Sequence, residues 1–144
     1  YWGTTVAGNA LAKARIGKTM TREKAAKIVD DLVDRVKTVN SEPKSLFSVH
    51  RVELFGSFTD PDRQDVGDVD ARVLFERRVD GDEFMRRTAA VAAAAESRGR
   101  RFRNPVDRLS FAELELQRYL RGRSARLDVQ FDVIGQERPC LTAW

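Results

Sequence analysis

Leu54-Phe55-Gly56-Ser57, followed eleven positions after the serine by Asp68-Val69-Asp70, is the stretch that decides the predicted fold. It predicts a strand ending in a Gly-Ser turn, then a short helix and loop, and then a second strand that opens with two carboxylates. Alternate residues of a strand share a face, so Asp68 and Asp70 lie about 7 Å apart along the backbone. Both side chains could therefore reach one small cation.

The chemistry of this stretch favours a phosphate next to a metal ion. Two uncompensated carboxylates repel each other, which indicates a bound divalent cation or a raised pKa. Gly56 permits close approach to the backbone, and Ser57 is expected at a helix N-terminus, where free N–H groups favour a phosphate. Such a site suits metal-assisted phosphoryl or nucleotidyl transfer. The alternative is a turn glycine followed by a solvated acidic strand.

The charges of the chain are unevenly distributed. The 144 residues suffice for one domain with a real core, and the net charge is +4. Residues 49–80 carry five basic and eight acidic side chains, whereas basic residues predominate on both sides of this block. The pattern fits a cation site approached by a nucleotide or nucleic acid. A solvated, arginine-rich bacterial surface would look the same.

Other simple signals exclude several classes of protein. No signal peptide or run of eighteen apolar residues is present, which predicts a soluble, cytoplasmic protein without membrane contact. The single cysteine, Cys140, cannot form an internal disulfide, and the single histidine, His50, has no pattern of zinc ligands around it.

The remaining pattern predicts an α/β (α+β) fold, with a small mixed β-sheet of about four strands and helices packed mainly on one side. The strands named by their patterns are 49–55, 68–75 and 126–133. In the second, Asp68, Asp70 and Arg72 are expected on the site face. Thr21 is the expected N-cap of a first helix, whose apolar stripe runs to residue 39. A second helix is expected from residue 82, with its stripe at Phe84, Thr88, Val91, Ala92 and Ala95. A Ser110–Glu113 capping box predicts a third helix, which ends at Gly122.

Residues 98–103, Arg-Gly-Arg-Arg-Phe-Arg, form a cluster of four arginines around one phenylalanine. Such a cluster can bind phosphates and stack on a base. At the C-terminus of a helix it also complements the helix dipole and ends the helix through Gly99. Both interpretations stay open.

Gly56-Ser57, the ten-residue gap and Asp68-Val69-Asp70 resemble the signature of the DNA polymerase β-like nucleotidyltransferase superfamily, in particular its small bacterial members. The resemblance covers residues 48–76 well and extends more loosely to about residue 133. It implies a nucleotidyltransferase-like fold in which Gly56 and Ser57 hold the phosphates of a nucleoside triphosphate (NTP). It also implies that Asp68 and Asp70 bind two Mg²⁺ ions together with a third carboxylate from a later strand.

The third carboxylate is expected in the strand 126–133. Asp128 and Asp132 are about 13 Å apart along a strand, so both cannot serve one metal pair. Asp128, near the strand start, is the choice, to complete the metal site and act as base; Asp132 is the alternate. Arg72 could contact the triphosphate or form a structural ion pair.

Two positions depart from the family pattern. Asp60 stands where small members often have a basic residue, and Gly67 stands where they often have Ser or Thr. Asp60 adds negative charge near the expected phosphates, for which Arg63 or Arg72 could compensate.

Residues 1–20 are expected to be an N-terminal extension, and residues 21–144 the nucleotidyltransferase-like domain. The stretch 4–12 resembles the end of a winged-helix domain, which implies a preceding DNA-binding module; a simple extension is the alternative. The predicted function is Mg²⁺-dependent transfer of a nucleoside monophosphate to a hydroxyl of a protein, RNA or small molecule. The alternatives are a non-catalytic nucleotide-sensing or DNA-binding regulator and a toxin–antitoxin component. The sequence does not select the acceptor, the nucleotide or the oligomeric state.

Overall fold

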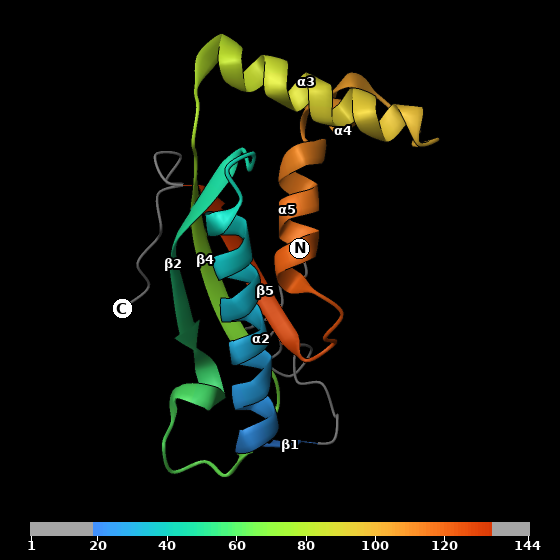
Figure 1. The fold of residues 1–144 in the computed structure, drawn as a ribbon. Coiled ribbons are helices and arrows are strands. Elements are labelled where there is room, and N and C mark those ends of the chain that lie inside the picture. The colour runs from blue at the N-terminus through green and yellow to red at the C-terminus, as the bar shows by residue number, and fades with distance from the viewer. Residues whose placement is uncertain (1–18, 134–144) are drawn as a thin grey trace, which may run out of the picture.

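The computed structural model describes residues 19–133 of the 144-residue chain. Four α-helices, five strands and one 3₁₀ turn make up this part of the chain (Figure 1). In chain order they are β1 (Met20–Thr21), α2 (Arg22–Ser41), β2 (Phe47–Phe55), the 3₁₀ turn η1 (Gly56–Thr59), β3 (Asp65–Val66), β4 (Val69–Arg77), α3 (Gly81–Ser97), α4 (Pro105–Leu109), α5 (Phe111–Arg121) and β5 (Leu127–Val133).

The strands form two small sheets. The main sheet has the order β2-β4-β5, with β2 antiparallel and β5 parallel to β4. Within residues 19–133 this sheet has three strands, compared with the predicted sheet of about four. The two short strands β1 and β3 pair only with each other. The mixed architecture agrees with the predicted α/β (α+β) class.

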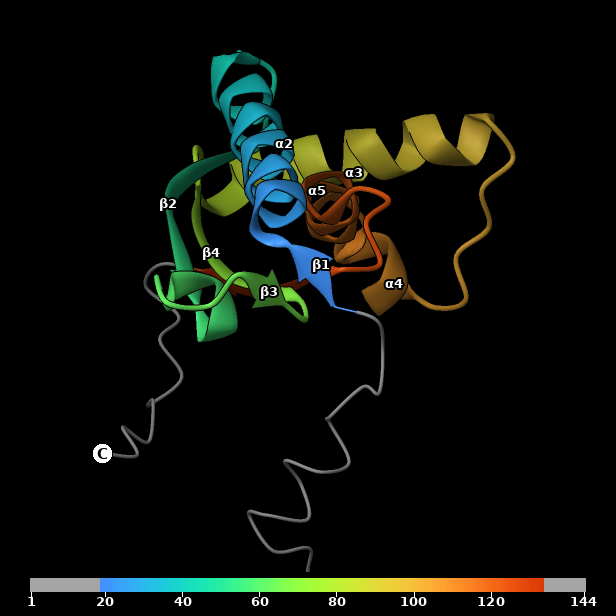
Figure 2. The ribbon, with the colours of Figure 1, turned by 90° about the horizontal axis from the view of Figure 1, so that it is seen from below.

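Helices α2 and α5 cover one face of the main sheet, as the view from below shows (Figure 2). Helix α3 instead extends past the end of the sheet and contacts α4 and α5 (Figure 1). Helices α3, α4 and α5 together connect the parallel strands β4 and β5. Among residues 19–133 no helix packs on the second face of the sheet, which carries the candidate site.

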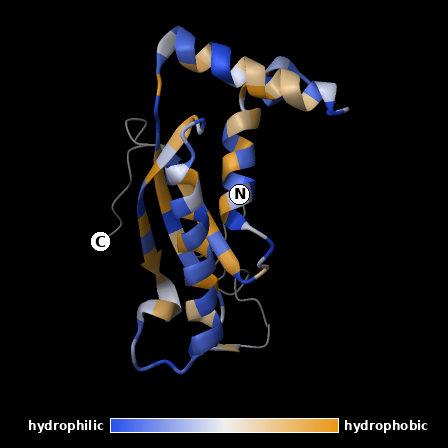
Figure 3. Cartoon of the chain, viewed as in Figure 1, coloured by the Kyte–Doolittle hydropathy of each residue, from blue (hydrophilic) through white to orange (hydrophobic). Residues whose placement is uncertain are grey.

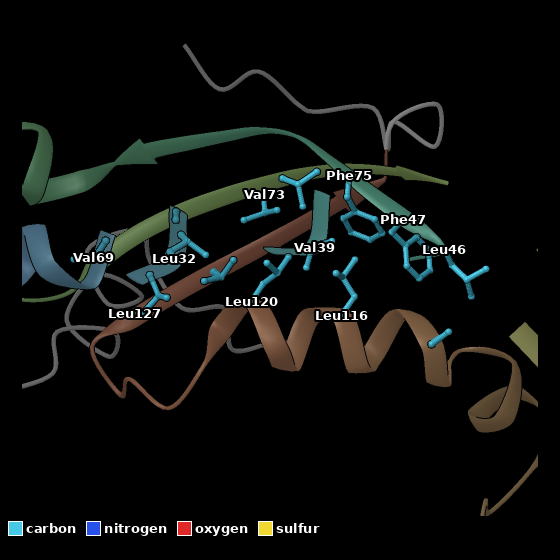
Figure 4. Close-up of a cluster of buried hydrophobic side chains, with 14 of the residues drawn as sticks. Leu32, Val39, Leu46, Phe47, Val69, Val73, Phe75, Leu116, Leu120 and Leu127 are labelled. Atoms are coloured by element: carbon cyan, nitrogen blue, oxygen red, sulfur yellow. The ribbon is translucent and has the colours of Figure 1, made fainter. Parts of the chain in front are cut away.

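The core lies between the sheet and helices α2 and α5 (Figure 4). The predicted alternation of β4 is confirmed, because its four inward residues are fully buried: Val69, Ala71, Val73 and Phe75. The stripe of α2 is confirmed too, with Leu32 and Ala25 at its centre. Hydrophobic positions accordingly line the inner faces of the elements (Figure 3). Burial of these apolar side chains is the main force that holds the layers together.

Strand β2 contains a bulge at His50. The register with β4 shifts between Val49 and Arg51, so the exposed His50 is an extra residue. Val49 and Val52, three positions apart, can both face the helices only because of this extra residue. The bulge thus sets which β2 residues lie beside the carboxylates of β4.

Helix termini follow the predictions in part. Thr21 caps α2 by accepting from the backbone N–H of Lys24, and Gly99 and Gly122 end α3 and α5 with positive φ. The capping box at Ser110 is wrong: Ser110 makes no side-chain cap bond, because α4 ends directly at this residue and leaves its backbone helical. Val91, predicted in the apolar stripe of α3, is 37% exposed, because α3 reaches past the sheet.

The predicted N-terminal extension lies almost entirely outside the described residues, and the same holds for the winged-helix-like stretch 4–12 and for Cys140. Met20, at the end of that extension, pairs with Val66 in the small sheet. No helix among residues 19–133 is long and apolar enough to span a bilayer.

Candidate functional site

Three chain segments meet where the strands of the main sheet lie beside the Gly-Ser turn. Phe55, the last residue of β2, is paired with Asp70, and Asp70 is paired with Asp128 across the parallel β4–β5 ladder. Paired residues of neighbouring strands project to the same side. Asp70 and Asp128 therefore lie side by side on the face that the helices leave uncovered, next to the start of η1 at Gly56.

Gly56 is in direct contact with the Asp70 carboxylate. A Cβ placed on Gly56 would lie 2.3 Å from Asp70 Oδ2, which is closer than non-bonded atoms can approach. Gly56 also has φ +76°, a conformation that side chains disfavour. Both observations explain why glycine occupies this position, and they place the turn against the carboxylate cluster.

Asp68 lies one residue before β4, whose observed start is Val69 rather than the predicted Asp68. Its Oδ1 atom is buried and accepts no hydrogen bond, although Arg126 Nη1 lies 3.7 Å away. Arg126 donates from the same nitrogen to the Gly67 carbonyl. The Asp68 carboxylate is thus an incompletely satisfied acceptor at the edge of the cluster.

Arg126 is a residue of the candidate site that the sequence pattern did not reveal. The alternation of 126–133 places it only on the outer face of a strand. Because Val69 pairs with Leu127, the preceding residues Asp68 and Arg126 face each other across the ladder. A charge pair of this kind becomes visible only when the register is known.

The three carboxylates influence one another electrostatically. Partial burial raises the pKa of the Asp70 carboxyl above its usual range, and the neighbouring charges of Asp128 and Asp68 raise that pKa further. All three causes act in the same direction. A cation bound among the three side chains would remove the repulsion.

This raised pKa predicts that the Asp70 carboxylate costs stability near neutral pH. A carboxyl with a higher pKa in the folded state holds its proton more firmly when folded, so its contribution to stability falls as the pH rises through that pKa. We expect Asp70→Asn to raise the Tm at about pH 7 in EDTA, and the gain to shrink toward zero near about pH 3.5, where the carboxyl is protonated. Thermal unfolding of both proteins across this range tests the sign; a gain that does not change with pH would contradict it.

The register separates the two candidates for the third carboxylate. Asp128 is opposite Asp70, whereas Asp132 is opposite Leu74, four positions further along the sheet. Asp132 instead forms an ion pair with Arg72, at 3.4 Å from Nε. The structure therefore brings Asp128, and not Asp132, to Asp70.

Both arginines suggested as compensation for Asp60 already have acidic partners. Arg72 lies between Asp132 and Glu53, whose Oε2 is 3.8 Å from Nη1. Arg63 is 3.9 Å from Asp60 itself. The geometry of Arg72 corresponds to the structural ion pair considered as an alternative to phosphate contact.

Ser57 lies in η1, so the predicted short helix after the strand is present as a single 3₁₀ turn. A turn of four residues has a small dipole, which gives weaker support to anion binding than an α-helix would. Within residues 19–133, no three His, Cys, Asp or Glu side chains are arranged closely enough to hold a metal ion. The carboxylates are neighbours, but they do not converge on one point.

Arg22, at the first position of α2, fastens the loop that follows the Gly-Ser turn. Its guanidinium donates to the carbonyl oxygens of Phe58, Asp60 and Arg63, and lies 5.2 Å from the centre of the Phe58 ring. Its backbone N–H donates to Gln64. One side chain therefore replaces hydrogen bonds that the loop cannot make internally. No sequence motif announces this contact, because it joins residues about forty positions apart.

We expect Arg22→Ala to destabilise the protein by about 1–2 kcal/mol, because several loop carbonyls lose a charged donor. Limited proteolysis should then cut first within residues 58–66. Lys24→Ala is the matched control, since the Lys24 side chain forms no ion pair or hydrogen bond within residues 19–133. Equal unfolding midpoints for the two variants would show that Arg22 does not hold the loop.

Comparisons with models of protein families, with curated proteins and with solved structures found no match for this chain.

Proposed function

We propose that this protein is a magnesium-dependent nucleotidyltransferase that moves a nucleoside monophosphate from an NTP to a hydroxyl group. The observation that carries the proposal is the contact between Gly56 and the Asp70 carboxylate. Asp128 lies beside Asp70, and Asp68 is near enough to raise the pKa of the Asp70 carboxyl. A phosphate held at the turn would lie beside the carboxylates, where a metal-bound triphosphate has to be. The family resemblance of the Gly56-Ser57 and Asp68-Val69-Asp70 stretches supports the same interpretation.

The residues fit Mg²⁺ in their chemistry. Carboxylate oxygens are the ligands that this ion prefers, and the buried Asp68 Oδ1 atom accepts no hydrogen bond. Asp68, Asp70 and Asp128 would hold the metal, which when bound neutralises charge on the phosphates and polarises the α-phosphate. Since the three side chains do not converge on one point, binding would require the Asp68 or Asp128 side chain to turn toward Asp70.

The chain's own residues would then have separate tasks. Gly56 and Ser57 would hold the β- and γ-phosphates in line with the attack. Asp128, the most exposed of the three strand-end carboxylates, would accept the proton of the acceptor hydroxyl. The acceptor oxygen forms a bond to the α-phosphorus, the bond from that phosphorus to the bridging oxygen breaks, and pyrophosphate leaves.

A nucleotide-sensing protein without catalysis is the second candidate. It is favoured by Asp60, because this carboxylate lies in the loop after the Gly-Ser turn while Arg63 and Arg72 are engaged in ion pairs. If the site attracted the triphosphate more weakly, the protein would bind the nucleotide without transferring the nucleoside monophosphate efficiently. The same geometry would also serve a regulatory or toxin–antitoxin component.

Calorimetric titration of each NTP, with Mg²⁺ and with EDTA, tests the proposal first. Magnesium-dependent binding followed by pyrophosphate release in the presence of an acceptor supports the transferase. Binding without pyrophosphate release from any acceptor supports the sensor. Absence of binding for all NTPs with Mg²⁺ would refute both.

A further inference from the structure

The segment from Arg98 to Arg123 is a second charged feature, separate from the carboxylate cluster. It contains eight arginines, three acidic residues and no lysine. Arg108 pairs with Glu96, and Arg118 pairs with Glu115. The other six have no ion pair within residues 19–133: Arg98, Arg100, Arg101, Arg103, Arg121 and Arg123. Such an excess of unpaired, exposed cations is suited to a polyanionic partner.

At one end of α5, Arg100, Arg101 and Arg103 lie around an aromatic pair. Phe102 and Phe111 meet edge to face with ring centres 5.1 Å apart, and the Arg100 guanidinium lies within 6 Å of both rings. Arg101 and Arg103 line the same hollow, which has a volume of about 220 Å³. Planar guanidinium and ring surfaces are thus gathered at one place.

A wider cleft of about 820 Å³ lies between α2 and the other end of α5. It is lined by Arg35, Arg123 and the ring of Tyr119, which is 45% exposed. Arg35 is held there by donating to the Leu120 carbonyl and by packing against Gly122. Arg118 lines both this cleft and the smaller hollow, so the two lie on either side of one arginine side chain of α5.

We propose that this face of α5, from the hollow at Phe102 to the cleft at Tyr119, binds single-stranded nucleic acid. Arginine forks pair with phosphates, and the exposed ring of Tyr119 offers a surface on which an unpaired base can stack. An acidic protein or an anionic membrane would match the charge but would not use aromatic rings set inside arginine-lined hollows. A duplex keeps its bases stacked internally and would use the arginines alone.

This inference does not rest on the proposed transferase activity. The face consists of residues from α2, α4 and α5, from the segment before α4 and from the loop after α5, and includes none of Gly56, Asp68, Asp70 or Asp128. Binding can therefore be measured in EDTA and without nucleotide. If the protein proved not to be a transferase, the measured binding of nucleic acid would be unaffected. If it did not bind nucleic acid, the proposed transferase activity would be unaffected.

Fluorescence anisotropy with labelled twelve-nucleotide oligo(U) and oligo(dT) tests the surface. We expect Arg101→Glu/Arg103→Glu to weaken binding at least about tenfold and to reduce the slope of log K against log salt, because phosphate contacts are lost. Lys24→Glu/Lys44→Glu is the control, since it changes the net charge equally at exposed residues that line neither hollow. Equal weakening by both pairs would overturn the proposal, because it would show a response to net charge alone.

A second pair of variants tests base stacking. Tyr119→Ala should weaken oligo(U) binding by about fivefold or more, whereas Met85→Ala, at an equally exposed apolar position on α3, should not. Thermal unfolding of each variant reports whether the fold is kept. The assignment to a single strand would be overturned if a twelve-base-pair duplex or anionic phosphatidylglycerol vesicles bound as tightly as oligo(U) and Tyr119→Ala had no effect.

Discussion

Asp70→Asn is expected to reduce magnesium-dependent NTP binding at least about 100-fold while the protein stays folded. Asp70 is the central carboxylate of the site, since it contacts Gly56, pairs with Asp128 and is close to Asp68. Asparagine has the same shape but carries no charge, so it removes the proposed metal ligand without creating a cavity. It also relieves repulsion, which is why the same variant is expected to be more stable near neutral pH without metal.

Asp132→Asn is the matched control for this experiment. The substitution is chemically identical and lies on the same sheet face, but Asp132 contacts Arg72 and is four positions from Asp128. Calorimetric titration with Mg²⁺ and the preferred NTP should show nearly unchanged affinity for Asp132→Asn. If Asp70→Asn bound nucleotide and metal as the wild type does, the proposed site would be wrong. If Asp132→Asn gave the larger loss, the third carboxylate would have to be reassigned.

Gly56→Ala is the second substitution with a large expected effect. The new methyl group would lie only 2.3 Å from Asp70 Oδ2, so the carboxylate has to turn away from the Gly-Ser turn. We expect at least about a 30-fold loss of magnesium-dependent NTP affinity. The positive φ of this residue adds a stability cost of about 1–2 kcal/mol.

Gly99→Ala separates these two effects. Gly99 also has a positive φ, but a Cβ there would meet no atom within 4 Å. The two alanine variants should therefore lose similar stability in urea unfolding, and only Gly56→Ala should lose nucleotide binding. Loss of binding in both would mean that general destabilisation, and not the contact with Asp70, is responsible.

Local patterns predicted most of the elements of the main sheet and its helical layer. The alternation in 68–75 identified the buried face of β4, and the apolar stripe after Thr21 identified the buried face of α2. These predictions succeed because the side-chain period of a strand or helix is fixed by backbone geometry and is visible in the sequence. The glycine ends of α3 and α5 were predictable for the same local reason.

The errors arose where a neighbouring element decides the conformation. The Ser110–Glu113 pattern matches a capping box, yet Ser110 follows α4 without a break and Glu113 accepts a hydrogen bond from Gln117 instead. Val91 fits the helical stripe of α3, but this helix reaches beyond the sheet that would have covered it. Pattern alone does not tell how far a helix extends past its partner.

The sequence by itself determined the strands and helices of the layer around the core, the Gly-Ser turn and the acidic strand start, because each depends on residues close together in the chain. Only the tertiary structure decided which residues lie together around Asp70 and Asp68. Strand register selects Asp128 over Asp132 and brings Arg126 to Asp68. Arg22 reaches a loop about forty residues away. Contacts of this kind depend on how separate elements pack, and the local periodicity of the sequence does not specify that packing.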